Sequence, residues 1–140
     1  MTADRTPAPR DLIATAISDL VSIAAFAVVG RSAHGLALDA PGIVETAWPF
    51  AAACAVAWAA LLALRVDPSR VWPGGVAVWL ATVAGGLGLR LLSGETAAVA
   101  FVIVATLVLG ALLLITRAAQ ALGRRARARA AGEDRSTAAR

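Results

Sequence analysis

The acidic residue Asp19 is the most unusual chemical group in this 140-residue chain, because it lies within a long apolar stretch near the amino terminus. Thr15, Ser18, Asp19 and Ser22 follow the i, i+3, i+4, i+7 spacing that brings side chains onto one face of a helix. A carboxyl group beside hydroxyls can hold a proton or bind a small solute. The stripe therefore indicates a polar site, and its meaning depends on the elements around it.

Those elements are four apolar stretches that are long enough to cross a membrane. A helix of about 20 predominantly apolar residues spans a hydrocarbon core about 30 Å thick. Hydrophobic residues make up 59% of the chain and charged residues only 16%, a balance that argues against an ordinary soluble enzyme. We expect an all-α integral membrane four-helix bundle over residues 12–117, with helices at about 12–29, 46–64, 71–92 and 96–116.

Asp19 lies near the middle of the first predicted span, so it should face protein or water rather than lipid. Counting about 1.5 Å of helix rise per residue places Thr82 and Thr106 at a similar depth, with Cys54 and Trp58 nearby. One hypothesis is a proton or small-solute site at this layer. The alternative is structural, with a protonated Asp19 hydrogen-bonded to a neighbouring helix.

A second group of polar residues is expected at the outer end of the bundle and comprises Arg31, His34, Glu45, Arg90 and Glu95. These groups could bind an anionic ligand or respond to pH through His34. Alternatively, the two arginines reach lipid headgroups or pair with Glu45 and Glu95. With one histidine and one cysteine in the chain, we expect no metal site and no cofactor.

The distribution of arginine predicts the orientation in the membrane. Ten of the 13 arginines lie in the two tails or between the second and third spans, and Arg117 directly follows the fourth span on the same side. Only Arg31 and Arg90 lie on the other side. The positive-inside rule then places both termini in the cytoplasm of a multi-pass cell-membrane protein. A cleaved signal peptide over residues 5–30 is the competing interpretation, although Asp19 and the length of the apolar run argue against it.

Residues 1–11 and 118–140 form the predicted tails. The second tail contains four closely spaced arginines, Arg124, Arg125, Arg127 and Arg129. We expect this basic part to continue the fourth helix and to contact anionic lipids rather than nucleic acid. The last ten or so residues are polar and are expected to be disordered.

Small residues recur every fourth position in two spans, at Ala51, Ala55, Ala59 and Ala63 and at Ala77, Ala81 and Gly85. Such ridges let helices approach closely, within one chain or between copies, so a homo-oligomer is expected. The tripeptide Glu-Thr-Ala opens both the second and the fourth span, at 45–47 and 95–97. This suggests two repeated helix pairs, with chance similarity in an alanine-rich chain as the alternative.

Several short motifs together resemble a known family. They are Gly30-Arg31-x-x-His34, Pro49-Phe50, Trp72-Pro73, Leu89-Arg90 and the run from Phe101 to Thr106. Over about residues 12–117 the chain resembles the family called domain of unknown function 3054. The resemblance implies a small four-span prokaryotic membrane protein and supplies no reaction. The Trp-Arg pair that often closes the last helix of the family is Thr116-Arg117 here.

The function favoured by these patterns is transport or sensing of a proton or small solute through the polar layer at Asp19. The alternative is a non-catalytic scaffold or accessory subunit that assembles through its alanine and glycine faces. An enzyme is favoured less, because no nucleophile is paired with a base and no catalytic residue is identified.

Overall fold

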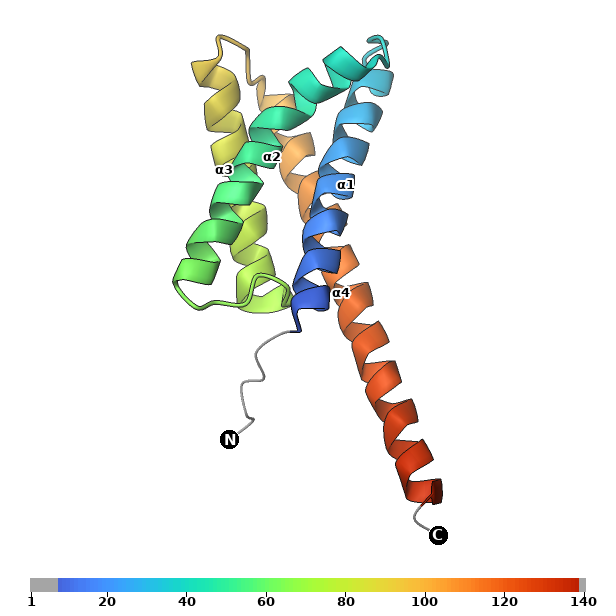
Figure 1. Ribbon diagram of the computed structural model, residues 1–140. Helices are drawn as coiled ribbons and strands as arrows, with labels where there is room; N and C mark the ends of the chain where they lie inside the picture. Colours follow the sequence, from blue (N-terminus) through green and yellow to red (C-terminus); the bar gives the residue numbers. More distant parts are fainter. Residues whose placement is uncertain (1–7, 139–140) are drawn as a thin grey trace.

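The computed structural model describes the backbone of residues 8–138 and the side chains of residues 8–132. Its elements are α1 (Pro9–Ala33), α2 (Ala40–Ala63), a tight turn η1 (Val71–Gly75), α3 (Val76–Leu92) and α4 (Val99–Ala138). The four helices run alternately up and down (Figure 1), which confirms the all-α four-helix bundle. In Figure 1 the upper end carries connections 34–39 and 93–98, and the lower end carries connection 64–70.

All four helices are long and apolar enough to cross a membrane. In α1 the distribution of polar groups is the reverse of that in a soluble protein, because Thr15, Asp19 and Ser22 are buried. Leu20 and Val21, by contrast, are more than half exposed. An apolar exterior around a polar interior face is what a lipid environment favours.

Local signals explain where the helices begin and end. The side chain of Asp39 accepts a hydrogen bond from the backbone N–H of Gly42, 2.9 Å away, and so caps α2. As a result α2 begins at Ala40, earlier than the expected residue 46, and Pro49 lies inside the helix rather than in its first turn. After α1 and α3, Gly35 and Gly94 adopt positive φ and reverse the chain.

The region before α3 is not regular helix. Trp72 has an extended backbone conformation within η1, and the Trp72–Pro73 peptide bond is cis. Regular helix therefore begins at Val76, five residues after the expected start at residue 71. The two glycines at the end of η1 are buried.

Helix α4 extends far beyond the other three helices, below the bundle in Figure 1. Its residues 118–138 add about 30 Å of helix at the usual rise. The basic segment continues the fourth helix, as expected. The backbone is helical to Ala138, and residues 139–140 lie outside the described part. The disorder expected for the last ten or so residues stays a prediction. Most of the predicted tail at 1–11 also lies outside it, since residues 1–7 are not described.

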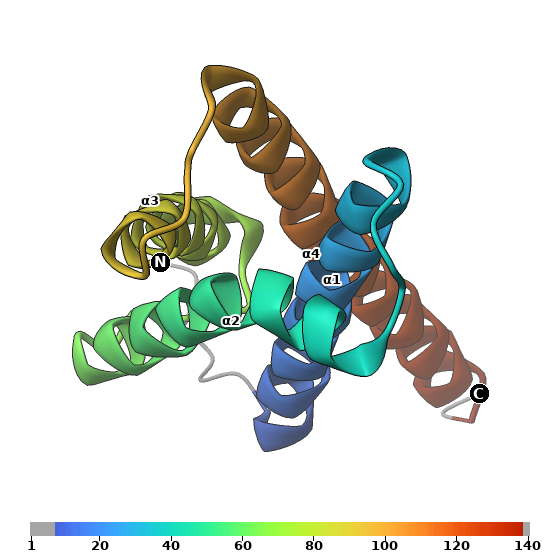
Figure 2. The same cartoon turned by 90° about the horizontal axis from the view of Figure 1, so that it is seen from above.

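The helices pack in a ring in which α1 contacts α2 and α4, and α3 contacts the same two helices. Figure 2, seen from above, shows α1 between α2 and α4. In the core, the rings of Phe26, Phe50 and Phe101 pack together with centroids 5.3 to 6.4 Å apart. Gly86 lies against Phe50, where a Cβ atom would overlap the ring. This aromatic cluster lies about two helical turns above Asp19, counted along α1.

Candidate functional site

Asp19 forms a buried ion pair with Arg117 of α4 in the lower half of the bundle. The two guanidinium nitrogens Nη1 and Nη2 donate to Oδ1 and Oδ2 of Asp19 at 2.6 and 2.7 Å. Arg117 is fully buried and Asp19 is 1% exposed. Two parallel charge-assisted hydrogen bonds between buried groups make this a strong and geometrically specific contact.

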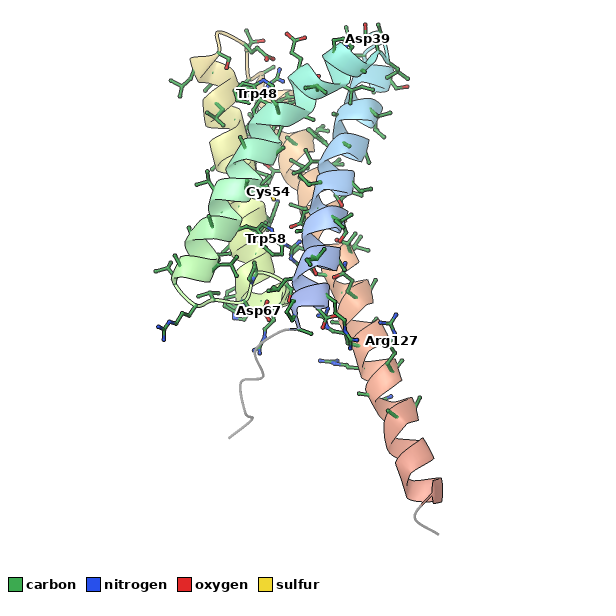
Figure 3. All side chains as sticks on the ribbon, in the orientation of Figure 1. Asp39, Trp48, Cys54, Trp58, Asp67 and Arg127 are labelled. Carbon is green, nitrogen blue, oxygen red and sulfur yellow. The ribbon has the colours of Figure 1, made fainter. Side chains whose placement is uncertain are left out.

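Helix α2 completes the surroundings of the carboxylate. Trp58 Nε1 donates to Asp19 Oδ2 at 2.8 Å, and the thiol of Cys54 lies 4.0 Å from the same oxygen. Figure 3 shows Trp58 closer to the lower connection, which contains Asp67, than to Asp39 at the upper end. Asp19 therefore joins three helices at one point.

The lower connection supplies the remaining partners of Arg117. Its Nε donates to the carbonyl oxygen of Pro68 at 3.0 Å, and Nη1 also donates to the carbonyl oxygen of Leu113 at 2.9 Å. The Asp67 carboxylate holds this connection in place by accepting hydrogen bonds from the backbone N–H and hydroxyl of Ser69. A Cβ atom on Gly75 would lie 2.6 Å from Arg117 Cδ, so glycine leaves room for the arginine stem.

Two hydroxyls of the α1 stripe, those of Thr15 and Ser18, contact Gln120 of α4. Thr15 Oγ1 donates to Gln120 Oε1 at 2.5 Å, and Gln120 Nε2 donates to Ser18 Oγ at 2.8 Å. Ser22 donates to the carbonyl oxygen of Ser18 at 2.7 Å. Of the predicted polar layer, Ser18 therefore contacts α4 through Gln120, and Ser22 bonds to the backbone of its own helix.

The two threonines predicted at the same depth differ from one another. Thr82 is fully buried, and its hydroxyl lies beside the Cys54 thiol without forming a hydrogen bond of good geometry with any described residue. Thr106 donates to the carbonyl oxygen of Val102 at 2.7 Å and accepts from Trp79 Nε1 through its own carbonyl at 3.0 Å. The hydrogen bonds of Thr106 thus serve the contact between α3 and α4.

The five polar residues predicted at the outer end all line one cavity at the upper end of the bundle, of about 640 Å³. We call it the upper cavity. Its rim is formed by Arg31, His34, Glu45, Arg90 and Glu95, and its walls are mainly apolar, with Phe26, Val29, Phe101, Val104 and Val108 from α1 and α4. The five residues that the sequence analysis expected at one end of the bundle therefore lie together.

The two arginines of the upper cavity have partners. Arg90 forms an ion pair with Glu95, as one of the alternatives expected, and its guanidinium carbon lies 4.7 Å from the centroid of the Phe101 ring. Arg31 donates to the carbonyl oxygen of Ala37 at 2.8 Å, and its guanidinium lies 3.9 Å from the Asp39 carboxylate. Arg31 is therefore paired with Asp39 rather than with Glu45.

Two rim residues lack such partners. Within residues 8–132, no side chain forms a hydrogen bond or an ion pair with the Glu45 carboxylate or the His34 imidazole. The Nε of Arg90 is also buried without a hydrogen-bond acceptor there. In the same residues, no group of three His, Cys, Asp or Glu side chains is placed to hold a metal ion. The upper cavity can therefore still form polar contacts with a ligand.

Arg117 was missed as a site residue by the sequence analysis, which treated it as the end of the fourth span. Trp58 was placed near the depth of Asp19, but it was not identified as a partner of the carboxylate. One signal was available for Arg117. A lone carboxylate in an apolar span needs a counter-charge, and Arg117 directly follows another such span.

These features define a multi-pass α-helical membrane protein built as a small four-helix bundle. The chain belongs to the family described as Protein of unknown function (DUF3054), whose model matches residues 16–120. The match includes Asp19, Arg117 and every residue that lines the upper cavity. No curated protein and no solved structure gives a significant match.

Proposed function

We propose that this protein binds a small amphiphilic solute in the upper cavity and transports it across the membrane or senses it. The observation that carries the proposal is the cavity itself, which combines apolar walls with a charged rim. Its volume lies within the range of about 300–1,000 Å³ typical of small-molecule sites. A solute with an apolar body and a polar group matches both parts.

The proposed orientation places the upper cavity on the outer side of the cell membrane. Most arginines lie in the segments at the lower end, which supports a cytoplasmic location for that end and for both termini. The exposed arginines Arg125, Arg127 and Arg129 of α4 then lie on the cytoplasmic side. There they would contact anionic lipid headgroups near the membrane surface.

In this proposal the Asp19–Arg117 pair is structural. A proton or solute taken up at Asp19 would have to replace two hydrogen bonds from Arg117 and one from Trp58. Breaking such a buried pair is costly. The hypothesis that Asp19 itself carries the proton or solute stays a prediction. It requires that Asp19→Asn abolish flux into proteoliposomes while the protein still folds.

The test of solute binding uses the purified protein in nanodiscs of phosphatidylcholine, with empty nanodiscs as the blank. A panel of radiolabelled aromatic amphiphiles with positive, zero or negative charge is measured by equilibrium binding. Ala100 lines the cavity, so Ala100→Trp should weaken saturable binding at least tenfold. The matched control is Ala55→Trp, at an exposed position of α2 outside the cavity. Absence of saturable binding, or unchanged binding in Ala100→Trp, would overturn the proposal.

The second candidate function is a scaffold or accessory subunit, alone or as a homo-oligomer. It is favoured by a groove of about 660 Å³ between α2 and α3, which is lined by small residues including Ala52, Ala60, Ala81 and Gly88. Small-residue surfaces allow close helix contacts in membranes. Under this alternative, Ala81→Leu should abolish chemical cross-linking between copies or to a partner and should leave solute binding unchanged.

A further inference from the structure

The charges around the upper cavity are not balanced. Two carboxylates, Glu45 and Glu95, line the cavity with two guanidiniums, Arg31 and Arg90, and a third carboxylate, Asp39, lies outside the lining at 3.9 Å from Arg31. Each guanidinium is already paired with one carboxylate, Arg31 with Asp39 and Arg90 with Glu95. With a neutral histidine, the formal charge of this group is one unit negative. The rim is therefore better suited to a cation than to an anion.

The guanidinium groups of Arg31 and Arg90 are also largely occupied by partners within the protein, so they are poorly placed to bind an anion. Arg31 is engaged by Ala37, Thr46 and Asp39, and its side chain is only 13% exposed. Arg90 is engaged by Glu95 and lies over the ring of Phe101, with 14% of its side chain exposed. An anion would have to displace existing carboxylates before it could bind either arginine.

Glu45 is the carboxylate at the upper cavity that forms no ion pair with a described residue. It lies in α2 at the rim of the cavity, it is exposed, and no side chain within residues 8–132 pairs with it. Because it is not needed by an arginine, its carboxylate can contact an incoming positive group without any internal bond being broken. A charge-assisted contact at the edge of an apolar site is stronger than one in bulk water.

The depth of the cavity suits an aromatic or branched apolar body. Phe26 and Phe101 provide ring surfaces, and Val104 and Val108 of α4 complete the walls. Val29 on α1 and Val104 on α4 are both more than half exposed, so the cavity adjoins the face that meets lipid. An apolar solute dissolved in the membrane can reach it from that side.

We infer that the solute is a lipophilic cation, held by its apolar groups between α1 and α4 and by its positive charge at Glu45. This inference rests on the proposed function and adds the charge class of the ligand and the residue that recognises it.

The test compares two probes of nearly the same size and shape and opposite charge, tetraphenylphosphonium and tetraphenylborate. Each is titrated into the full-length protein in uncharged phosphatidylcholine nanodiscs, with empty nanodiscs subtracted. Tetraphenylphosphonium should bind at least tenfold more tightly than tetraphenylborate. Glu45→Gln should weaken tetraphenylphosphonium binding at least tenfold and should fold normally, because Glu45 has no partner to lose. Glu45→Asp, which keeps the charge, should retain most of the affinity.

The possible failures are distinguishable. The charge assignment is overturned if tetraphenylborate binds more tightly than tetraphenylphosphonium. It is also overturned if Glu45→Gln binds tetraphenylphosphonium as tightly as the unchanged protein while Ala100→Trp binds it weakly. In either case, solute binding in the cavity stands. If neither probe, nor any other amphiphile of the panel, binds saturably, both the inference and the proposed function are overturned.

Discussion

The two polar regions of this bundle are made of the same groups and differ in how completely those groups are satisfied. At the lower end, a guanidinium, a carboxylate and an indole form a closed set in which Asp19 and Arg117 are at most 1% exposed. At the upper end, the ion pairs are partly exposed, and Glu45 and one nitrogen of Arg90 have no partner within the described residues. A closed set stabilises the fold, whereas an incomplete one can bind a ligand.

The regions also differ in what they connect. The lower pair joins residues 98 positions apart and holds α1 against α4. The upper pairs, Arg31 with Asp39 and Arg90 with Glu95, join residues that are close in sequence, so they order their own connections. No upper ion pair within residues 8–132 ties α1 to α4, and the upper cavity lies between these two helices. The cavity therefore lies where ion pairs do not hold the two helices together.

The largest effect is expected from removing one charge of the lower pair. Asp19→Leu leaves the Arg117 guanidinium buried without a counter-charge, which should lower the free energy of unfolding by about 3–5 kcal/mol. Reversible unfolding in mixed detergent micelles measures this change. By contrast, Asp39→Asn at the upper end removes a half-exposed partner and should cost less than about 1 kcal/mol.

A double variant tests whether the lower pair acts as a unit. Asp19→Leu combined with Arg117→Met leaves no buried charge, and replacing a buried pair by apolar groups is often nearly neutral. The double variant should therefore be more stable than Asp19→Leu alone. If Arg117→Met instead lowers the free energy of unfolding further in the double variant, the two charges are not coupled. The lower pair would then not differ from the upper ion pairs in the way described.

The next largest loss of stability is expected from Gly75→Ala, with Gly30→Ala as its comparison. Gly75 lies against Arg117, so Gly75→Ala would crowd the arginine stem and should cost about 1–3 kcal/mol in the same unfolding measurement. Gly30 lines the upper cavity, where a Cβ atom would meet nothing within 4 Å. Gly30→Ala should therefore be neutral or slightly stabilising. Equal losses at both positions would show that the upper end is packed as closely as the lower end.

The smallest effect is expected at Thr82. Its buried hydroxyl has no hydrogen-bond partner in the described part of the chain, so Thr82→Val should change the free energy of unfolding by less than about 1 kcal/mol, or raise it. Thr106→Val serves as the control, because it removes the bond to Val102 and should cost about 1 kcal/mol. A clear loss of stability in Thr82→Val would indicate that its hydroxyl belongs to the polar layer around Asp19.

The architecture was predictable because length and hydropathy alone determine which segments can cross a membrane, and those four segments became α1 to α4. The five residues of the upper cavity were predictable because they flank the ends of the spans, where connections bring them together. The pairing of Asp19 with Arg117 was not predictable, because it depends on the rotation of α4 about its axis and on its axial position relative to α1. Helix counting gives depth with an error of about one turn and gives no rotation.

Packing details escaped the sequence for the same reason. Ala55 and Ala59 form the predicted ridge of α2, yet both are exposed, and the buried alanines are Ala53 and Ala57. In a helix rich in alanine, every face carries small residues, so spacing alone does not identify the face that meets α3. Whether the exposed ridge meets another copy stays a prediction, as does the repeat of two helix pairs.

Helix α4 is one unbroken rod whose upper part forms a wall of the cavity, whose middle carries Arg117, and whose lower part projects from the bundle with its arginines exposed. A continuous helix has no joint to absorb motion. A displacement of the projecting part along the helix axis would therefore reach the cavity wall only by moving Arg117, and the two hydrogen bonds from Arg117 to Asp19 oppose such a movement.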